Sequence, residues 1–281
     1  MFKKALVGVD LSPAEKSLLS CLPDLGSWGI DSVVLTHVIR IGYAQGAGYG
    51  HEDEYRAWLE KAATPIREAG LTVTTLVTAS GVPADELLAV AQAQGADLVV
   101  VGSRSHNFLY EIFLGSVAKE VIRKSKIPVL IERLEPTRVG QPETCAAICS
   151  RAPDRILLAT DLSAQSRSAE DAAVRLAGKA GHVDCLTVLA ADASEDERQA
   201  AQTRHQDLVR RIKDGGGDAG SRIEQGDPSE IIARTGQEGY SLIIVGKHGR
   251  NWVTGKIIGS TAEKVCEIAR RPVLMIPLQK E

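Results

Sequence analysis

The strongest constraint on the fold is an internal repeat, because long segments from the first half of this chain of 281 residues return in the second half in the same order. KKALVGVDLSP (3–13) corresponds to DRILLATDLSA (154–164), and GSVAKEVIRKSKIPVLI (115–131) corresponds to GSTAEKVCEIARRPVLM (259–275). Each copy is long enough to bury a core of its own, so the repeat predicts two domains in tandem. The predicted parts are a first domain over 1–136, a linker over 137–153 and a second domain over 154–281.

Short apolar runs alternate with helical stretches in both copies. Apolar residues at three- and four-residue spacing predict helices over 83–94 and 194–213, and the second ends at the glycines that begin with Gly215. Strands that alternate with helices imply right-handed crossovers and a parallel sheet. The predicted strands are 3–9, 32–39, 71–78, 97–101 and 127–132 in the first copy, and 154–160, 183–190, 220–224, 241–245 and 272–277 in the second.

Composition narrows the class of protein. Hydrophobic residues make up 44% of the chain but aromatic residues only 4%, so aliphatic side chains must fill the core, as in buried parallel sheets. The net charge of -3 lacks the basic excess of a nucleic-acid binder. We find no apolar run of membrane-spanning length and no signal peptide, and the five cysteines are scattered. We therefore expect a cytoplasmic protein with reduced thiols and neither nucleic-acid nor membrane partners.

The second copy carries a glycine framework at a strand end and a helix start. Gly246 ends a predicted strand, and Gly249 follows after two intervening residues. Gly259, Ser260 and Thr261 open a helix after nine more. Glycine lets the backbone approach a phosphate and adopt positive φ, and a helix start offers free N–H groups and the positive end of a dipole. The framework predicts a phosphate site, and the alternative is that the glycines serve only a tight turn.

Polar neighbours of the framework admit two interpretations. Asp161 ends the first strand of the second copy, where its carboxylate could accept hydrogen bonds from a ribose or an adenine amine. Lys247 and Arg250 could neutralise phosphate charge, and His248 could touch a phosphate. Equally, these three residues could be ordinary solvated loop residues.

The first copy departs from the framework at one position. Gly102, Gly115 and Ser116 keep the spacing, and Asp10 corresponds to Asp161. Ser105 replaces the second glycine, however, and its Cβ costs about 1 kcal/mol if φ must be positive. We expect this copy to bind a nucleotide weakly or not at all.

Both copies resemble the universal stress protein family in its tandem two-domain form. The resemblance rests on the strand-end Asp-Leu-Ser triplets, the Gly-x-Pro after the third strand, the glycine framework, and the IPVL and RPVL segments of the final strands. It implies two α/β domains, each a Rossmann-like (adenine nucleotide α-hydrolase-like) five-stranded parallel sheet of order 3-2-1-4-5. It also implies an intramolecular pseudo-dimer with 127–132 beside 272–277, although two chains could associate as a homodimer as well.

In that family the pattern G-x2-G-x9-G-[S/T] marks members that bind ATP, and the second copy matches it throughout. The resemblance implies that Asp161 and the backbone near Val188 face the adenosine, while the triphosphate lies on the amides and hydroxyls that follow. The implied second-domain residues are Asp161, Val188, Gly246, Lys247, His248, Gly249, Arg250, Gly259, Ser260 and Thr261. The weaker first-domain counterparts are Asp10, Val38, Gly102, Arg104, Ser105, Gly115 and Ser116.

Three functions remain open. The first is a stress-response or regulatory protein that binds ATP, or ADP or AMP, with Mg²⁺ on the phosphates. The second is a protein-interaction module with vestigial sites. The third is a hydrolase, which we expect to be slow at most, because the sequence has no Walker loop, no H-E-x-x-H and no G-x-S-x-G elbow. Cys145 and Cys149 could join a zinc site, but zinc takes four ligands and no second pair is nearby.

Overall fold

The fold is taken from a computed structural model of the chain, which forms two compact units, Phe2–Cys149 and Ser150–Glu281. Each unit is described by itself. The structure describes residues 2–11, 15–41, 51–103, 114–136, 145–148, 153–250 and 257–278.

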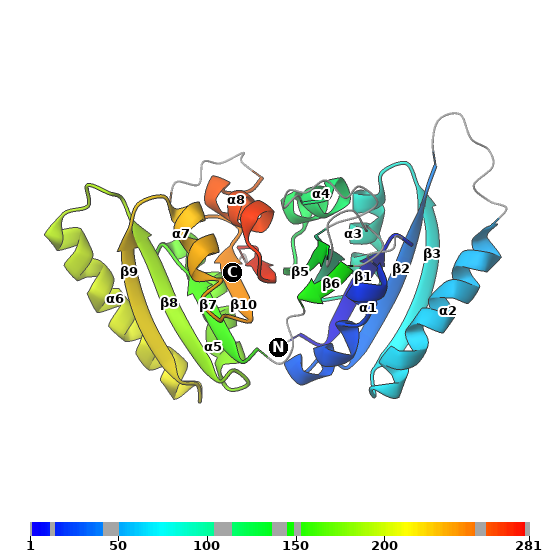
Figure 1. The fold of residues 1–281 in the computed structure, drawn as a ribbon, viewed down its shortest axis with the longest axis horizontal. Coiled ribbons are helices and arrows are strands. Elements are labelled where there is room, and N and C mark those ends of the chain that lie inside the picture. The colour runs from blue at the N-terminus through cyan, green and yellow to red at the C-terminus, as the bar shows by residue number, and fades with distance from the viewer. Residues whose placement is uncertain are drawn as a thin grey trace. The chain divides into compact units, whose positions relative to one another are not determined.

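The first unit is a parallel sheet with flanking helices (Figure 1). Its strands pair in the order β3-β2-β1-β4-β5, which is the predicted order 3-2-1-4-5. The α/β fold class is confirmed. The elements are β1 (Lys4–Val9), α1 (Glu15–Leu19), η1 (Leu22–Trp28), β2 (Ser32–Arg40), α2 (Glu52–Glu68), β3 (Thr72–Ser80), α3 (Pro83–Ala93), β4 (Leu98–Gly102), α4 (Ser116–Lys124), β5 (Val129–Pro136) and β6 (Cys145–Ile148).

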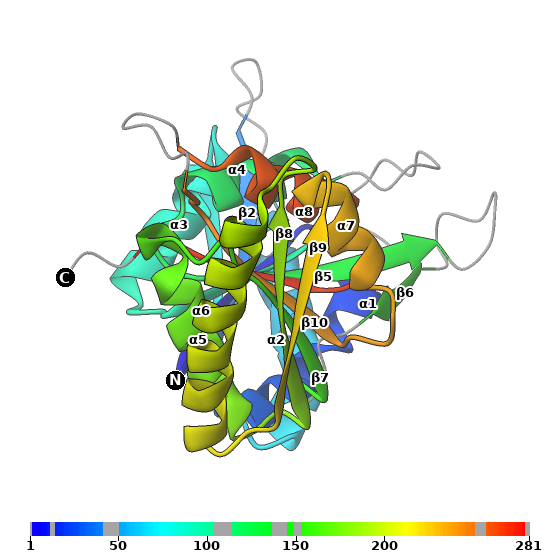
Figure 2. The ribbon, with the colours of Figure 1, turned by 90° about the vertical axis from the view of Figure 1, so that its left-hand side faces the viewer.

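The second unit repeats this arrangement in the order β9-β8-β7-β10-β11. Figure 2 shows α5 and α6 on one side of the sheet and α7 and α8 on the other, as right-handed crossovers require where the strand order reverses. The elements are β7 (Arg155–Ala159), η3 (Ala164–Ser166), α5 (Arg167–Ala177), β8 (His182–Leu189), α6 (Glu195–Asp214), β9 (Ala219–Gln225), α7 (Pro228–Thr235), β10 (Leu242–Gly246), α8 (Ser260–Ile268) and β11 (Val273–Ile276).

One strand was not foreseen. Residues 137–153 have no hydrophobic period, which predicts a linker, yet β6 pairs antiparallel with the far end of β5, with Arg133 opposite Ile148 and Pro136 opposite Cys145. The first unit therefore carries a short antiparallel strand beyond its five parallel ones. Backbone pairing needs only an unpaired strand edge, and sequence periodicity does not report where such an edge lies.

The central strands explain why aliphatic side chains dominate the composition. Leu242, Ile243, Ile244 and Val245 of β10 are all buried, and so is the corresponding run Leu98–Val101 of β4. Helices cover both faces of a parallel sheet, so successive side chains on opposite faces are all removed from water. No helix within the described ranges is both long enough and apolar enough to cross a bilayer.

The cysteines do not all behave as expected. Cys185 and Cys266 are buried free thiols, which agrees with the expectation. Cys21, however, is disulfide-bonded, so the expectation of reduced thiols is wrong for that residue. Sequence spacing could not reveal this, because a disulfide depends on which thiols the fold brings within reach.

Candidate functional site

A cavity of about 360 Å³ opens at the carboxyl ends of β7, β8 and β10 in the second unit. In a parallel sheet this edge collects the residues that follow each strand, and it is where ligands bind in open α/β folds. All the second-domain residues singled out from the sequence line it: Asp161, Val188, Gly246, Lys247, His248, Gly249, Arg250, Gly259, Ser260 and Thr261.

The framework glycines are needed for close packing rather than for unusual dihedrals. None of Gly246, Gly249 and Gly259 has φ in the left-handed region, so the expectation of positive φ is wrong. A Cβ at Gly249 would instead lie 2.7 Å from Oδ2 of Asp161, and one at Gly259 would lie 3.3 Å from the carbonyl oxygen of Lys247. The absence of side chains thus lets the loop after β10 close against the end of β7.

The first turn of α8 presents unused backbone donors to the cavity. The amide of Gly259 donates to the carbonyl of Lys247 at 2.8 Å, and the first bond inside the helix runs from Glu263 N to Gly259 O. The amides of Ser260 and Thr261 therefore precede the first intrahelical bond and carry no backbone hydrogen bond within the described chain. These amides, the two hydroxyls and the helix dipole suit an anion.

Asp161 is held in place by the loops on either side of it. Its Oδ1 accepts hydrogen bonds from the amide and the hydroxyl of Ser163 at 3.0 and 2.6 Å, and its Oδ2 accepts one from the amide of Arg250. Burial works to raise the pKa of this carboxyl, but the hydrogen bonds outweigh burial and the pKa is lowered. The amide of Arg250, which we expected on the triphosphate, is therefore already engaged by Asp161.

The residue after each strand-end aspartate is strained in the same way in both units. Leu11 has φ of 61° and Leu162 has φ of 58°, in the left-handed region that side chains other than glycine rarely occupy. The amide of Leu162 donates to Oγ1 of Thr160 at 3.0 Å, and its carbonyl accepts from Arg204 at 2.8 Å. Residues in this region cluster at binding and catalytic sites, where surrounding contacts hold them.

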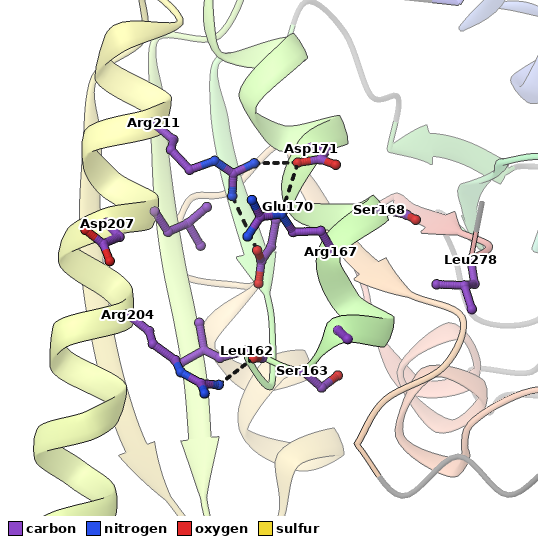
Figure 3. A pocket seen from close by; sticks show the side chains of 12 residues that line it. Leu162, Ser163, Arg167, Ser168, Glu170, Asp171, Arg204, Asp207, Arg211 and Leu278 are labelled. Atoms are coloured by element: carbon purple, nitrogen blue, oxygen red, sulfur yellow. Dashed lines mark hydrogen bonds and ion pairs between the residues drawn. The ribbon is translucent and has the colours of Figure 1, made fainter. Parts of the chain in front are cut away.

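Behind the cavity, Thr160 connects it to a polar groove between α5 and α6. Oγ1 of Thr160 donates to the buried Glu170 at 2.8 Å, and Glu170 lies 3.5 Å from Arg211, which also pairs with Asp171. Figure 3 shows Arg211 directed at both carboxylates. The groove holds about 870 Å³. The groove therefore contains the ion pairs of Arg211. The framework glycines line the smaller cavity and not this groove.

Burial lowers the pKa of two basic groups beside the framework. Lys247 is only 5% exposed, and burial lowers its pKa to about 8. Burial also lowers the pKa of His248, and the neighbouring Lys247 adds to that effect. An anion in the cavity would favour the charged form of Lys247, so anion binding and protonation are coupled there.

Sequence reasoning missed a buried hydrogen-bond chain beneath β8. Thr187 donates through Oγ1 to the carbonyl of Thr160 at 2.8 Å, and Nε2 of His205 lies 2.7 Å from the same Oγ1. His205 is 1% exposed, and burial lowers its pKa to about 4. The one available signal was a histidine on the apolar stripe of the predicted helix 194–213.

The first unit has a corresponding cavity of about 770 Å³. Its lining includes these counterparts: Asp10, Val38, Gly102, Gly115 and Ser116. Arg104, Ser105 and Cys149 lie outside the described residues. No group of three or more potential ligands that could hold a metal ion is found among the residues that the structure describes.

Comparison with known proteins matches residues 1–133 and 153–277, both units, to the universal stress protein family. The chain belongs to this family. A universal stress protein of Mycolicibacterium smegmatis is 25% identical over 298 residues, covering 96% of each chain. Universal stress protein YxiE of Bacillus subtilis is 34% identical over 149 residues, all of its own length and 47% of this chain. Among solved structures, a universal stress protein from Archaeoglobus fulgidus superposes with a TM-score of 0.72 at 25% identity, covering 99% of this chain and 97% of that one.

Proposed function

We propose that the second unit binds ATP, with Mg²⁺ on the phosphates, and that the protein acts as a nucleotide-binding regulator in a stress response. The observation that carries the proposal is that the whole predicted set of second-domain residues lines one cavity. That lining includes Ser260 and Thr261 at the start of α8, whose amides precede the first intrahelical hydrogen bond. The pattern that marks ATP-binding members of the family is complete at the same residues.

The contacts at the cavity favour phosphate at one end. Ser260 and Thr261 offer amides and hydroxyls where the helix dipole is positive, and Lys247 adds a cation when it is protonated. Arg250 differs, because its amide and its guanidinium are both bonded to Asp161, the guanidinium at 3.0 Å from the carbonyl oxygen. We therefore assign the phosphates to the start of α8, with Arg250 a contact only if it leaves Asp161.

The adenosine would lie toward β8, against Val188 and the strand-end Asp161. Two of the carboxylate's oxygen lone pairs are taken at Oδ1 and one at Oδ2, so one site remains for a ribose hydroxyl or an adenine amine. Within the first domain we propose that the nucleotide binds more weakly or not at all.

We also keep the intramolecular pseudo-dimer, in which the final strands predicted over 127–132 and 272–277 pair within one chain, as a proposal.

The test is the melting temperature with and without millimolar Mg·ATP on the wild type, Gly259→Val and Gly115→Val. Gly115 is a matched control, because its amide donates to the carbonyl of Ser103 at 2.9 Å and it precedes α4 as Gly259 precedes α8. A ligand at 100 times its Kd stabilises the folded state by about 2.7 kcal/mol. We expect a shift in the wild type and in Gly115→Val, and none in Gly259→Val.

No shift in the wild type, with protein shown to be free of co-purified nucleotide, would reject the proposal in favour of an interaction module. Equal shifts in all three proteins would place the nucleotide elsewhere. ADP and AMP in the same assay identify the preferred nucleotide, and released phosphate measures any slow hydrolysis.

A further inference from the structure

One difference between the two cavities concerns a side chain that follows the strand-end aspartate. Glu15 and Ser166 stand five residues after the strand-end Asp10 and Asp161. Ser166 is satisfied in its unit, since its hydroxyl donates to the carbonyl of Ser163 at 2.9 Å and lies 3.0 Å from Oγ1 of Thr160. The first unit places a carboxyl group where the second has a small hydroxyl.

Glu15 is buried without full hydrogen bonding. Its side chain lines the 770 Å³ cavity, the residue is only 3% exposed, and Oε1 has no hydrogen-bond partner within the described chain. Burial raises the pKa of this carboxyl to about 8; the backbone of Leu11 works against the rise, and the carboxylate of Asp10 adds to it. A buried carboxyl oxygen without a hydrogen-bond partner is costly, so Oε1 points to a partner that arrives with a ligand.

Other polar side chains besides Glu15 line the cavity. His37 is 8% exposed, and its Nδ1 lies 3.0 Å from the carbonyl oxygen of Val9, so Nδ1–H donates to that carbonyl. The ring of Tyr55 lies 4.9 Å from that of His37, between centroids, and forms an aromatic wall. Asp10 stands half-buried at the end of β1.

Among the described lining residues, one arginine and one histidine stand at the rim of this cavity. Arg40 and His51 are exposed, and His51 is hydrogen-bonded to Glu54. Glu120, half-buried on α4, pairs with Lys124 at 3.2 Å. Among the described lining residues, the interior therefore offers the carboxyl groups of Glu15 and Asp10 and no buried lysine or arginine.

We propose that the first unit's cavity binds a small primary amine as its ammonium ion, with the carboxylate of Glu15 as the partner of the ammonium and the rings of His37 and Tyr55 beside it. This ligand is of the opposite charge to the one proposed for the second unit. A phosphate is disfavoured in the first cavity, because the carboxylate of Asp10, which already works against ionisation of Glu15, would repel it.

Ion-pair formation releases a proton in this site. Below pH 8 the carboxyl of Glu15 carries a proton in the empty cavity, and the arriving ammonium keeps its own three protons. The carboxyl O–H therefore breaks, its proton passes to the buffer, and an ammonium–carboxylate pair remains. The charged and titratable groups facing Glu15 around the cavity are Asp10, His37, Arg40, His51, Tyr55 and Glu120.

The experiment is isothermal titration calorimetry on the full chain with tyramine, whose ring suits the aromatic wall, and with 4-ethylphenol, the same skeleton without the amine. We expect tyramine to bind and 4-ethylphenol not to bind. Titrations at pH 7 in two buffers of different ionisation enthalpy should report release of nearly one proton. Affinity should rise roughly 50-fold between pH 6 and pH 8, because protons compete with the ligand for Glu15.

Two variants isolate the carboxyl group. Glu15→Gln should abolish both the affinity for tyramine and the proton release, while Glu68→Gln, at an exposed carboxylate at the end of α2 that does not line the cavity, should leave both unchanged. Circular dichroism checks folding, and Gln at position 15 can still accept from the backbone. Absence of tyramine binding to the wild type, equal binding of 4-ethylphenol, or undiminished binding to folded Glu15→Gln would each overturn the proposal. Gly259→Val should not affect this site, so the outcome is independent of ATP binding.

Discussion

Lowering the pH from 7 to 5 should destabilise the second unit through one buried imidazole, that of His205. The only hydroxyl proton of Thr187 is donated to the carbonyl of Thr160, so His205 must donate through Nε2–H to Oγ1 of Thr187. Its Nδ1 is buried with no partner in the described chain. A proton placed there would create a buried charged N–H without an acceptor, which is why burial lowers the pKa of His205 to about 4.

The magnitude follows from linkage. The unfolded chain takes up this proton near its ordinary pKa of 6.5, whereas the folded unit takes it up only near 4, so the unfolded state binds more protons in between. Stability from this site is full above pH 6.5 and is lost as the pH falls toward 4. At 1.36 kcal/mol per unit of pKa, the loss between pH 7 and pH 5 is about 2 kcal/mol.

The assay compares urea unfolding of the wild type and His205→Gln at half-unit steps between pH 7.5 and 5. Glutamine does not titrate and retains an N–H donor for Thr187, so the difference in unfolding free energy between the two proteins isolates His205. We expect the unfolding free energy of the wild type to fall by about 2 kcal/mol relative to that of His205→Gln as the pH falls. A difference that stays constant, or an imidazole pKa above 6 by NMR titration of the native protein, would refute the reasoning.

Two further predictions concern the second unit, and the control for one of them lies in the first unit. His182 hydrogen-bonds Asp218 at 2.7 Å and Asp184 at 3.1 Å; burial opposes charging, but these bonds outweigh it and raise the pKa. The stability that His182 provides is therefore full below pH 6.5 and is lost as the pH rises through its folded-state pKa. The urea midpoint of the wild type should exceed that of His182→Gln at pH 6, and this difference should shrink by pH 8. Gly217→Ala should lower the unfolding free energy by about 1–3 kcal/mol, because the new Cβ would lie 2.6 Å from a Cβ of α5. Gly26→Ala, which meets nothing within 4 Å, should be nearly neutral, and equal urea midpoints for the two glycine variants would contradict the packing argument.

Much of the fold could be read from the sequence because its signals are local. The predicted strand 32–39 is observed as Ser32–Arg40, and the predicted helix 194–213 as Glu195–Asp214. Ser194 begins that helix with a capping box to Glu197, and glycine ends it. Alternation and helical spacing report which elements form, and the handedness of crossovers then leaves few ways to order a parallel sheet.

The residues of the candidate site were also available from the sequence, since strand ends and helix starts meet at one edge of such a sheet. What each residue does there was not available. Gly249 was expected to supply positive φ, but it makes room for Asp161. Arg250 was expected to offer its amide to a phosphate, but Asp161 already accepts from that amide. Both differences arise from contacts between loops that are far apart in the chain.

The strand order came with the resemblance to the universal stress protein family, whereas the sequence by itself determined the tandem α/β units and the residues at the mouth of each cavity. These follow from periodicity, chirality and the positions of glycine, which are properties of short segments. Only the tertiary structure decided that β6 pairs with β5, that Glu15 and His205 are buried, and that burial lowers the pKa of Lys247. Burial and desolvation depend on every element packed around a group, and no local pattern contains that information.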